Sequence, residues 1–276
     1  MKQFSKDSKT ADVSIIIVSF NTEKLTLGCI RSIEQEGSDV EREIIVVDNG
    51  STDRSISSLR KLPIKLIENK ANLGYAKANN QGIEIANGQY ILLLNSDTIV
   101  PRYAISKLLN FAKNKANAGV IGTKLLNANG SVQASCFHFP TIRRAILQYF
   151  LGKENFFDKY TPKTNIFAVV DSVVGAVFLM TPEALKKVGV LDERYFMYFE
   201  DLDYCRRVKR AGLKVYYYTG VSITHLHGAS GKNLGDSSDQ WRRLIPSSKI
   251  YHGVIYHNLL TCVLWLGQKW QKYFKK

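Results

Sequence analysis

Four short apolar runs, separated by helix-like segments, restrict the fold of this sequence more than any other feature. The runs are rich in Val, Ile and Leu and span residues 13–20, 43–48, 64–69 and 89–97. Continuous apolar runs of this kind are typical of parallel strands that are buried on both faces of a sheet. Strands that alternate with helices predict βαβ units and therefore a doubly wound α/β sheet.

Polar residues follow these runs where a ligand site is expected. In open α/β sheets, ligands bind beyond the carboxyl ends of the strands. Those ends read Phe20-Asn21, Asp48-Asn49 and Asn95-Ser96-Asp97. None of them carries a GxGxxG or GxxxxGK[ST] pattern, which argues against dinucleotide and P-loop sites.

An acidic step, Glu200-Asp201, begins a predicted helix that ends at Gly212. Apolar residues recur at three-residue spacing, acids fill the first turn and basic residues fill the last, as the helix dipole favours. Acids in a first turn often cap a helix without any catalytic role, so this reading stays open. The step lies between a strand that carries Gly175 and a β-rich run before His225, which favours a functional role.

The second half of the chain has a different pattern. Residues 119–135 predict a hairpin with its turn at Asn129-Gly130. Residues 137–167 are aromatic and basic without a clear period, and we interpret them as a substrate-binding excursion. Residues 168–180 predict a further strand, and Pro182 begins a helix.

Because no repeat or low-complexity linker divides the chain, we expect two parts. Residues 1–240 form the predicted catalytic domain, and residues 241–276 form a basic, amphipathic, helical appendage.

Positive charge is concentrated in this last segment. The chain has 38 Lys and Arg against 24 Asp and Glu, and residues 241–276 hold seven basic residues and no acid. The apolar run 254–266, too short to span a bilayer, is accompanied by Trp265, Trp270 and Tyr273. This combination favours an anionic membrane surface over a nucleic acid as partner. A core-packed helix with a solvated basic tail is the alternative.

Four cysteines lack any metal-ligand spacing, which indicates reduced thiols. The polar first residues lack a signal-peptide core. We therefore expect a cytoplasmic protein, peripheral on the inner face of the cell membrane, whose oligomeric state the sequence leaves open.

Seven motifs, taken in order, resemble the family 2 glycosyltransferases and, more narrowly, their bacterial rhamnosyltransferase-like branch. They read VSIIIVSFN, EIIVVDNGSTD, NLGYAKANNQGI, YILLLNSDT, VVGAVFLM, FMYFEDLDYCRRVKRAG and THLHGAS, and they cover residues 13–230. The resemblance implies the glycosyltransferase A fold, in which a Rossmann-like, mostly parallel sheet joins an acceptor-binding half. It also implies an inverting transfer from a nucleotide-diphosphate sugar with Mg²⁺ or Mn²⁺.

The resemblance assigns the catalytic base to Asp201, with Glu200 as the runner-up. A carboxylate has to take the proton of the acceptor hydroxyl as that hydroxyl attacks.

The metal ligands implied by the resemblance are Asp97 and His225. Asp97 matches the last acid of the family's DxD motif, and a strand-end carboxylate suits a hard cation. The chain departs from the motif at Asn95, so either the metal affinity is lower or Asn95 contacts ribose. His225 matches a metal-ligating position of some members, although a structural role is an alternative, and His227 has the weaker claim.

The remaining predicted contacts surround the nucleotide sugar. The resemblance implies that Asp48 contacts the base or ribose of the nucleotide. The alternative is that Asp48 forms a local turn with Ser51. The resemblance implies that Lys77 faces the phosphates. The alternative is that Lys77 is a solvated lysine on the surface of a helix. The full set is Ser19, Asn21, Asp48, Gly74, Lys77, Asn79, Asn95, Ser96, Asp97, Gly175 and Ala176.

The resemblance favours rhamnose from dTDP-L-rhamnose, and next a hexose from a UDP-sugar, moved to a hydroxyl of a lipid-linked or cell-surface glycan. Two other classes stay open. A sugar nucleotidyltransferase would usually carry a glycine-rich loop near the N-terminus, and none is present. A non-catalytic module that binds sugar nucleotides or membranes has Asn95 as its only support.

Overall fold

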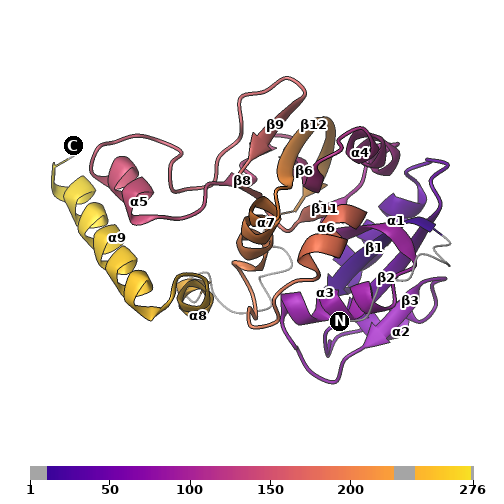
Figure 1. Cartoon of the computed structure of the whole chain (residues 1–276). Helices are drawn as coiled ribbons and strands as arrows, with labels where there is room; N and C mark the ends of the chain where they lie inside the picture. The colour runs from indigo at the N-terminus through magenta and orange to yellow at the C-terminus, as the bar shows by residue number, and fades with distance from the viewer. Residues whose placement is uncertain (1–10, 227–239, 275–276) are drawn as a thin grey trace.

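One large mixed sheet forms the centre of the protein (Figure 1). The computed structural model describes residues 11–226 and 240–274. Within those ranges the sheet has ten strands in the order β3-β2-β1-β4-β11-β6-β12-β5, with β7 paired to β6 and β9 paired to β12. The predicted α/β class is therefore confirmed.

The first half of the sheet is parallel and comes from the four apolar runs. Its strands are β1 (Ala11–Ser19), β2 (Arg42–Asp48), β3 (Lys65–Glu68) and β4 (Gly88–Asn95). Ser19 pairs with Asp48, and Val18 pairs with Asn95. This register brings the polar carboxyl ends of three strands to the same edge of the sheet.

Helices cover both faces of the sheet because alternate residues of β1 face opposite layers. Ile15 and Ile17 pack with Ile30 in one cluster, whereas Ile16 packs with Ile83 in the other. The first layer holds α1 (Glu23–Glu34) and α4 (Ala104–Lys113). The second layer holds α3 (Tyr75–Glu84), α6 (Pro182–Val188) and α7 (Glu200–Arg210). A short helix, α2, spans Ser55–Leu59.

The second half of the sheet brings distant segments to the same edge. The predicted hairpin is β6 (Ala118–Leu126) with β7 (Val132–Gln133). β12 (Lys214–His225) runs parallel to β6 and ends on β5 (Thr98–Ile99), where His225 pairs with Thr98. This pairing places His225 beside the turn that carries Asp97.

Two segments of this half have more secondary structure than the sequence indicated. Residues 168–180 form three strands instead of one, because the chain changes its pairing partner twice. β9 (Phe167–Val170) pairs with β12, and β10 (Ser172–Val173) pairs with β8 (Cys136–Phe137). β11 (Val177–Met180) pairs with β4 and β6. The aperiodic stretch 137–167 contains α5 (Ile142–Tyr149), whose N-cap Thr141 accepts the N–H of Arg144, and its role in substrate binding stays a prediction.

The C-terminal segment forms two helices that meet at Gly253, whose φ is +79°. They are α8 (Gln240–His252) and α9 (Val254–Phe274). In Figure 1 they lie to one side of the sheet, where α9 packs along α5. The hydroxyl of Tyr256 on α9 accepts the N–H of Ile142 at 3.0 Å. No helix in the described ranges is long and apolar enough to cross a membrane.

Candidate active site

Both carboxyls of the acid pair at the start of α7 have perturbed pKa values. Glu200 is buried, and Asp201 is half-buried. Burial, reinforced by the neighbouring Asp201 charge, raises the pKa of Glu200 to about 8. Burial also raises the pKa of Asp201, but hydrogen bonds from Leu202 and Gly175 and the charge of Lys159 oppose that effect. These hydrogen bonds and the lysine charge stabilise the ionised form of Asp201.

Asp201 is held in place by two backbone N–H groups. Its Oδ1 accepts the N–H of Leu202 at 2.8 Å, and its Oδ2 accepts the N–H of Gly175 at 3.1 Å. The carbonyl of Gly175 in turn accepts the hydroxyl of Tyr75 at 3.0 Å, and that hydroxyl also lies 3.1 Å from Oδ1 of Asn95. Tyr75 thus links the acid pair to the strand end that carries Asn95.

The backbone that leads into the acid pair is strained. Tyr198 and Phe199 both adopt left-handed conformations, with φ of 68° and 70°, which are costly for aromatic residues. Helix α8 holds this segment, because the hydroxyl of Ser247 donates to the carbonyl of Met197 at 2.8 Å and the ring of Tyr251 lies 5.3 Å from that of Phe199. The C-terminal segment is therefore part of the support of the candidate site.

Asp97 and His225, predicted as metal ligands, lie side by side. Asp97 follows β4 and is almost fully buried, and its Oδ1 is 3.3 Å from Nε2 of His225. The amide nitrogen of Asn95 lies 3.3 Å from the same Nε2. Nδ1 of His225 lies 2.8 Å from Oε1 of Gln133. His227 lies outside the described residues.

These two side chains fit a divalent cation that is shared with a ligand. No group of three or more His, Cys, Asp or Glu side chains could hold a metal within residues 11–226 and 240–274. A cation here would need further oxygens from a diphosphate and from water, which is the mode typical of Mg²⁺. One carboxylate and one imidazole can supply the protein's share.

Side chains also tie together the loops after β1 and β2. The N–H of Asn21 donates to the hydroxyl of Ser51 at 2.8 Å, and Oδ1 of Asn21 accepts the N–H of Thr52 at 2.7 Å. Oδ1 of Asp48 accepts the N–H of Ser51 at 2.8 Å, which is the local turn considered as the alternative. Oδ2 of Asp48 is buried without a hydrogen-bond partner in the described part of the chain. Asp48 therefore shapes the turn, and its contact with a nucleotide stays a prediction.

Ser19 and Ser96 lie beneath the loops. The hydroxyl of Ser19 is buried 3.1 Å from that of Thr26, and the hydroxyl of Thr22 donates to that of Ser96 at 3.4 Å. These bonds attach the start of α1 to the sheet. A contact of either serine with a nucleotide stays a prediction.

Gly74 lies where the loop before α3 meets the segment before α7. Its φ is +88°, and an added Cβ would lie 2.6 Å from the carbonyl oxygen of Phe196, which accepts the N–H of Tyr75 at 2.7 Å. Only glycine fits this contact. Lys77 is exposed on α3, whereas Asn79 donates to the carbonyl of Tyr75 at 2.9 Å, so their contacts with a nucleotide also stay predictions.

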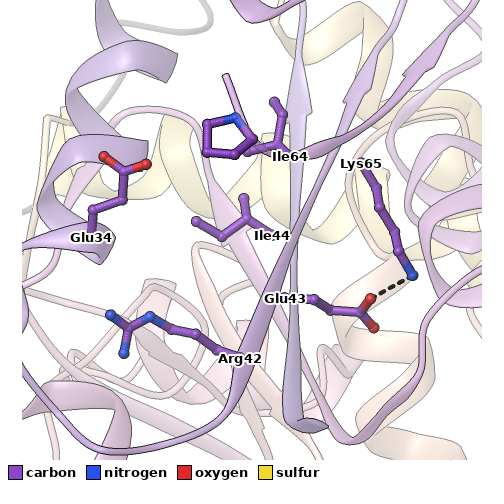
Figure 2. A pocket seen from close by; sticks show the side chains of 7 residues that line it. Glu34, Arg42, Glu43, Ile44, Ile64 and Lys65 are labelled. Atoms are coloured by element: carbon purple, nitrogen blue, oxygen red, sulfur yellow. Dashed lines mark ion pairs between the residues drawn. The ribbon is translucent and has the colours of Figure 1, made fainter. Parts of the chain in front are cut away.

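A hollow of about 520 Å³ opens at the other edge of the sheet (Figure 2). Its walls come from the end of α1 and the starts of β2 and β3, where Nζ of Lys65 lies 2.6 Å from Oε2 of Glu43. Ligands of open α/β sheets bind at the opposite, carboxyl ends. Because none of the predicted site residues lines it, this hollow is not the candidate active site.

Three residues near the site escaped the sequence analysis. Tyr75 directly follows Gly74, and its hydroxyl at the start of a helix was the only signal that could have identified it. Gln133 was visible only as the end of the predicted hairpin. Lys159, whose charge acts on Asp201, comes from the aperiodic stretch and gave no signal.

Comparison with known proteins identifies a matching family and several sequence relatives. The family described as Glycosyl transferase family 2 matches residues 14–172, more than half of the chain. The low-salt glycan biosynthesis hexosyltransferase Agl10 of Haloferax volcanii is 28% identical over 221 residues, which are 78% of this chain and 67% of that protein. The N-acetylglucosaminyl-diphospho-decaprenol L-rhamnosyltransferase of Mycobacterium tuberculosis is 29% identical over 213 residues, which are 69% of this chain and 68% of that protein.

Solved structures share the fold. GalNAc-T7 with UDP, GalNAc and Mn²⁺ superposes with a TM-score of 0.61 at 15% identity, covering 80% of this chain and 44% of that chain. S. aureus TarS 1-349 in complex with UDP-GlcNAc gives 0.57 at 17% identity, covering 95% and 73%. The predicted glycosyltransferase A fold is confirmed, and the match over residues 14–172 establishes that the chain belongs to glycosyl transferase family 2 and is a glycosyltransferase.

Proposed function

We propose that this glycosyltransferase moves a hexose with inversion from a nucleotide-diphosphate sugar to a hydroxyl of a lipid-linked or cell-surface glycan, with Asp201 as the general base. The acid pair is the observation that carries the proposal. Burial raises the pKa of Glu200 to about 8, whereas two N–H groups stabilise the Asp201 carboxylate and hold it in one orientation. A fixed, charged and partly accessible carboxylate is what a general base requires.

The transfer makes one bond and breaks another. The acceptor oxygen bonds to the anomeric carbon, and the bond from that carbon to the diphosphate oxygen breaks. The hydroxyl proton passes to Asp201, and the electron pair of the broken bond leaves with the nucleoside diphosphate. Because this is a single displacement, the configuration at the anomeric carbon inverts.

Asp97 and His225 would hold Mg²⁺ or Mn²⁺ at this edge. When bound, such an ion neutralises the charge that develops on the departing diphosphate. The 3.3 Å separation of their ligand atoms supports this role. With Asn95 in place of an acid, Asp97 supplies the only negative charge of the three-residue step, so we expect the nucleotide diphosphate to contribute strongly to cation binding.

The donor site would lie beside Asp48, whose buried Oδ2 faces no partner among the described residues. We favour dTDP-L-rhamnose as donor, followed by a UDP-hexose. The name of the mycobacterial relative supports the first, and the ligand of TarS supports the second. The further proposed donor contacts are Ser19, Asn21, Gly74, Lys77, Asn79, Asn95, Ser96, Gly175 and Ala176.

Helix α9 supports a peripheral contact with an anionic membrane on the cytoplasmic face. Its outer side exposes Ile255 at 79%, Leu259 at 55% and Trp265 at 58%, and it also carries Lys269 and Lys272. Apolar and aromatic side chains next to lysines suit the interface of an anionic bilayer. This contact would bring a lipid-linked acceptor to the catalytic domain.

An assay of transfer and donor choice tests the proposal. Purified full-length protein is titrated with dTDP-, UDP- and GDP-sugars, and release of nucleoside diphosphate is followed with and without a lipid-linked glycan acceptor. We expect the tightest binding for dTDP-L-rhamnose and a product of inverted configuration by NMR. A retained configuration would exclude a single displacement through Asp201.

A further inference from the structure

The hydrogen bonds of Gln133 determine which atom it presents to His225. Its amide nitrogen donates to Oδ1 of Asn127 at 2.9 Å. Asn127 is itself oriented, because its amide nitrogen donates to the hydroxyl of Ser131 at 2.9 Å, and that hydroxyl donates to Oδ1 of Asn129 at 2.7 Å. The oxygen of Gln133 therefore faces Nδ1 of His225 at 2.8 Å. Since an amide oxygen only accepts hydrogen bonds, Nδ1 carries a proton.

The opposite side of the imidazole favours the same tautomer. The single hydroxyl proton of Tyr75 is shared between the carbonyl of Gly175 at 3.0 Å and Oδ1 of Asn95 at 3.1 Å, and with that oxygen toward Tyr75 the amide nitrogen of Asn95 faces Nε2 of His225, 3.3 Å away. An amide nitrogen donates, so Nε2 has to offer its lone pair. The hydrogen bonds thus run in one direction: Tyr75 donates to Asn95, Asn95 donates to His225, and His225 donates to Gln133.

This direction also explains the departure from the DxD pattern. A carboxylate at position 95 would join that of Asp97 in attracting a proton to Nε2. The amide nitrogen of Asn95 instead donates toward Nε2 and opposes the effect of the Asp97 carboxylate, which lies 3.3 Å from the same nitrogen.

We propose that Gln133 is a positioning residue that fixes His225 as the Nδ1-protonated tautomer, so that Nε2 and Asp97 form a preorganised ligand pair for a divalent cation. The inference rests on the proposed metal dependence of the transfer and adds to it the residue that prepares the imidazole. Partners that hold the second nitrogen of a metal-ligating histidine orient the ring and increase its affinity for the ion.

The first test measures the tautomer without metal or donor. Full-length protein with ¹⁵N-labelled histidine is studied by NMR at alkaline pH, and His225→Gln assigns the signal. We expect a protonated Nδ1 in the parent protein and in Gln133→Glu, which keeps an acceptor oxygen. The control Val132→Thr, at an exposed neighbouring position on β7, should also keep Nδ1 protonated. In Gln133→Met, which has no such acceptor, the Nε2-protonated form should become populated. An unchanged tautomer in Gln133→Met would overturn the proposal.

The second test measures cation binding with Mn²⁺ alone, by electron paramagnetic resonance on the same variants. We expect Gln133→Met to bind Mn²⁺ roughly 10- to 100-fold more weakly than the parent. Gln133→Glu and Val132→Thr should remain within a few-fold of it. A shifted tautomer with unchanged Mn²⁺ affinity would refute the link between Gln133 and the cation.

The two tests separate this inference from the proposed function. The NMR measurement needs neither donor nor turnover, so a protein that proves inactive toward every donor still reports on Gln133. If Gln133→Met does not fold, Gln133→Glu and Asn127→Ala remain informative. Asn127→Ala releases the Gln133 amide without touching His225, and we expect a mixture of tautomers. A single Nδ1-protonated form in that variant would contradict the role assigned to the amide orientation.

Discussion

The N–H of Gly175 donates a 3.1 Å hydrogen bond to Oδ2 of Asp201, and the carbonyl of the same glycine accepts the hydroxyl of Tyr75. One peptide segment between β10 and β11 thus orients the proposed base and connects it to the strand end that carries Asn95. Substitutions on either side of Gly175 should therefore alter the orientation of the acid pair.

Asp201→Asn keeps the size of the side chain but removes the proton acceptor. We expect single-turnover transfer to slow by about 10²- to 10⁴-fold, with donor affinity nearly unchanged. Glu200→Gln is the matched variant and should lose less, because Glu200 is already neutral at pH 7. Asp201→Asn protein that folds and turns over within a few-fold of the parent would remove Asp201 from the mechanism.

Asp97→Asn removes the carboxylate proposed to bind the cation. We expect the affinities for Mn²⁺ and for nucleoside diphosphate to fall together, because each contributes ligands to the other's site. Calorimetric titration of each ligand, with and without the other, measures this coupling. Chelation should likewise abolish turnover in the parent, and full activity in excess chelator would count against the cation site.

The raised pKa of Glu200 predicts how stability changes with pH. An unfolded glutamate loses its proton near pH 4.5, whereas Glu200 keeps it to about 8 in the folded chain. Between these values the folded protein binds more protons than the unfolded one, so the free energy of unfolding falls as pH rises. Glu200→Gln cannot ionise, and its Tm should fall less than that of the parent across this window. Parallel Tm curves would show that Glu200 titrates normally.

Tyr75→Phe removes the hydroxyl that bonds Asn95 and Gly175. We expect a loss of about 1 kcal/mol of stability and slower transfer. Tyr204→Phe is the control, because its hydroxyl donates to the carbonyl of Gly189 at 2.9 Å, away from the proposed base. Thermal unfolding and initial rates should show similar destabilisation of both variants but slower transfer only in Tyr75→Phe. Equal rates in the two would assign Tyr75 a purely structural role.

Ile255→Ser and Leu259→Ser test the membrane contact without removing α8, which supports the strained segment before the acid pair. Each change should weaken co-sedimentation with anionic vesicles roughly tenfold. Val169→Ser, at an exposed apolar position on β9, should bind as the parent does. Equal binding by all variants would exclude α9 as the docking helix.

The parts of the fold that could be predicted are those with a strong local pattern. Strands buried on both faces read as apolar runs, which is why β1, β2 and β4 were found together with Asp48 and Asp97 after them. The start of α7 was found from its acids and its apolar spacing. These signals needed no knowledge of distant contacts.

The missed features depend on pairings between distant segments. Residues 168–180 break into three strands because β12, β8 and β4 each take a separate piece. Gln133 meets His225 only because β7 and β12 both pair with β6. The packing of Tyr251 on Phe199 likewise joins segments far apart in the chain, and no periodicity in either segment indicates it.

The pairing of Thr98 with His225 has a consequence for folding. β5 meets β12 through two residue pairs, and these join segments from the two halves of the catalytic fold. A contact between such distant segments closes a long loop, so its entropic cost has to be met by structure formed earlier. A nascent chain that has completed only β1 to β4 contains Asp97 without its imidazole neighbour. The proposed cation pair can therefore form only after the last strand of the sheet has docked.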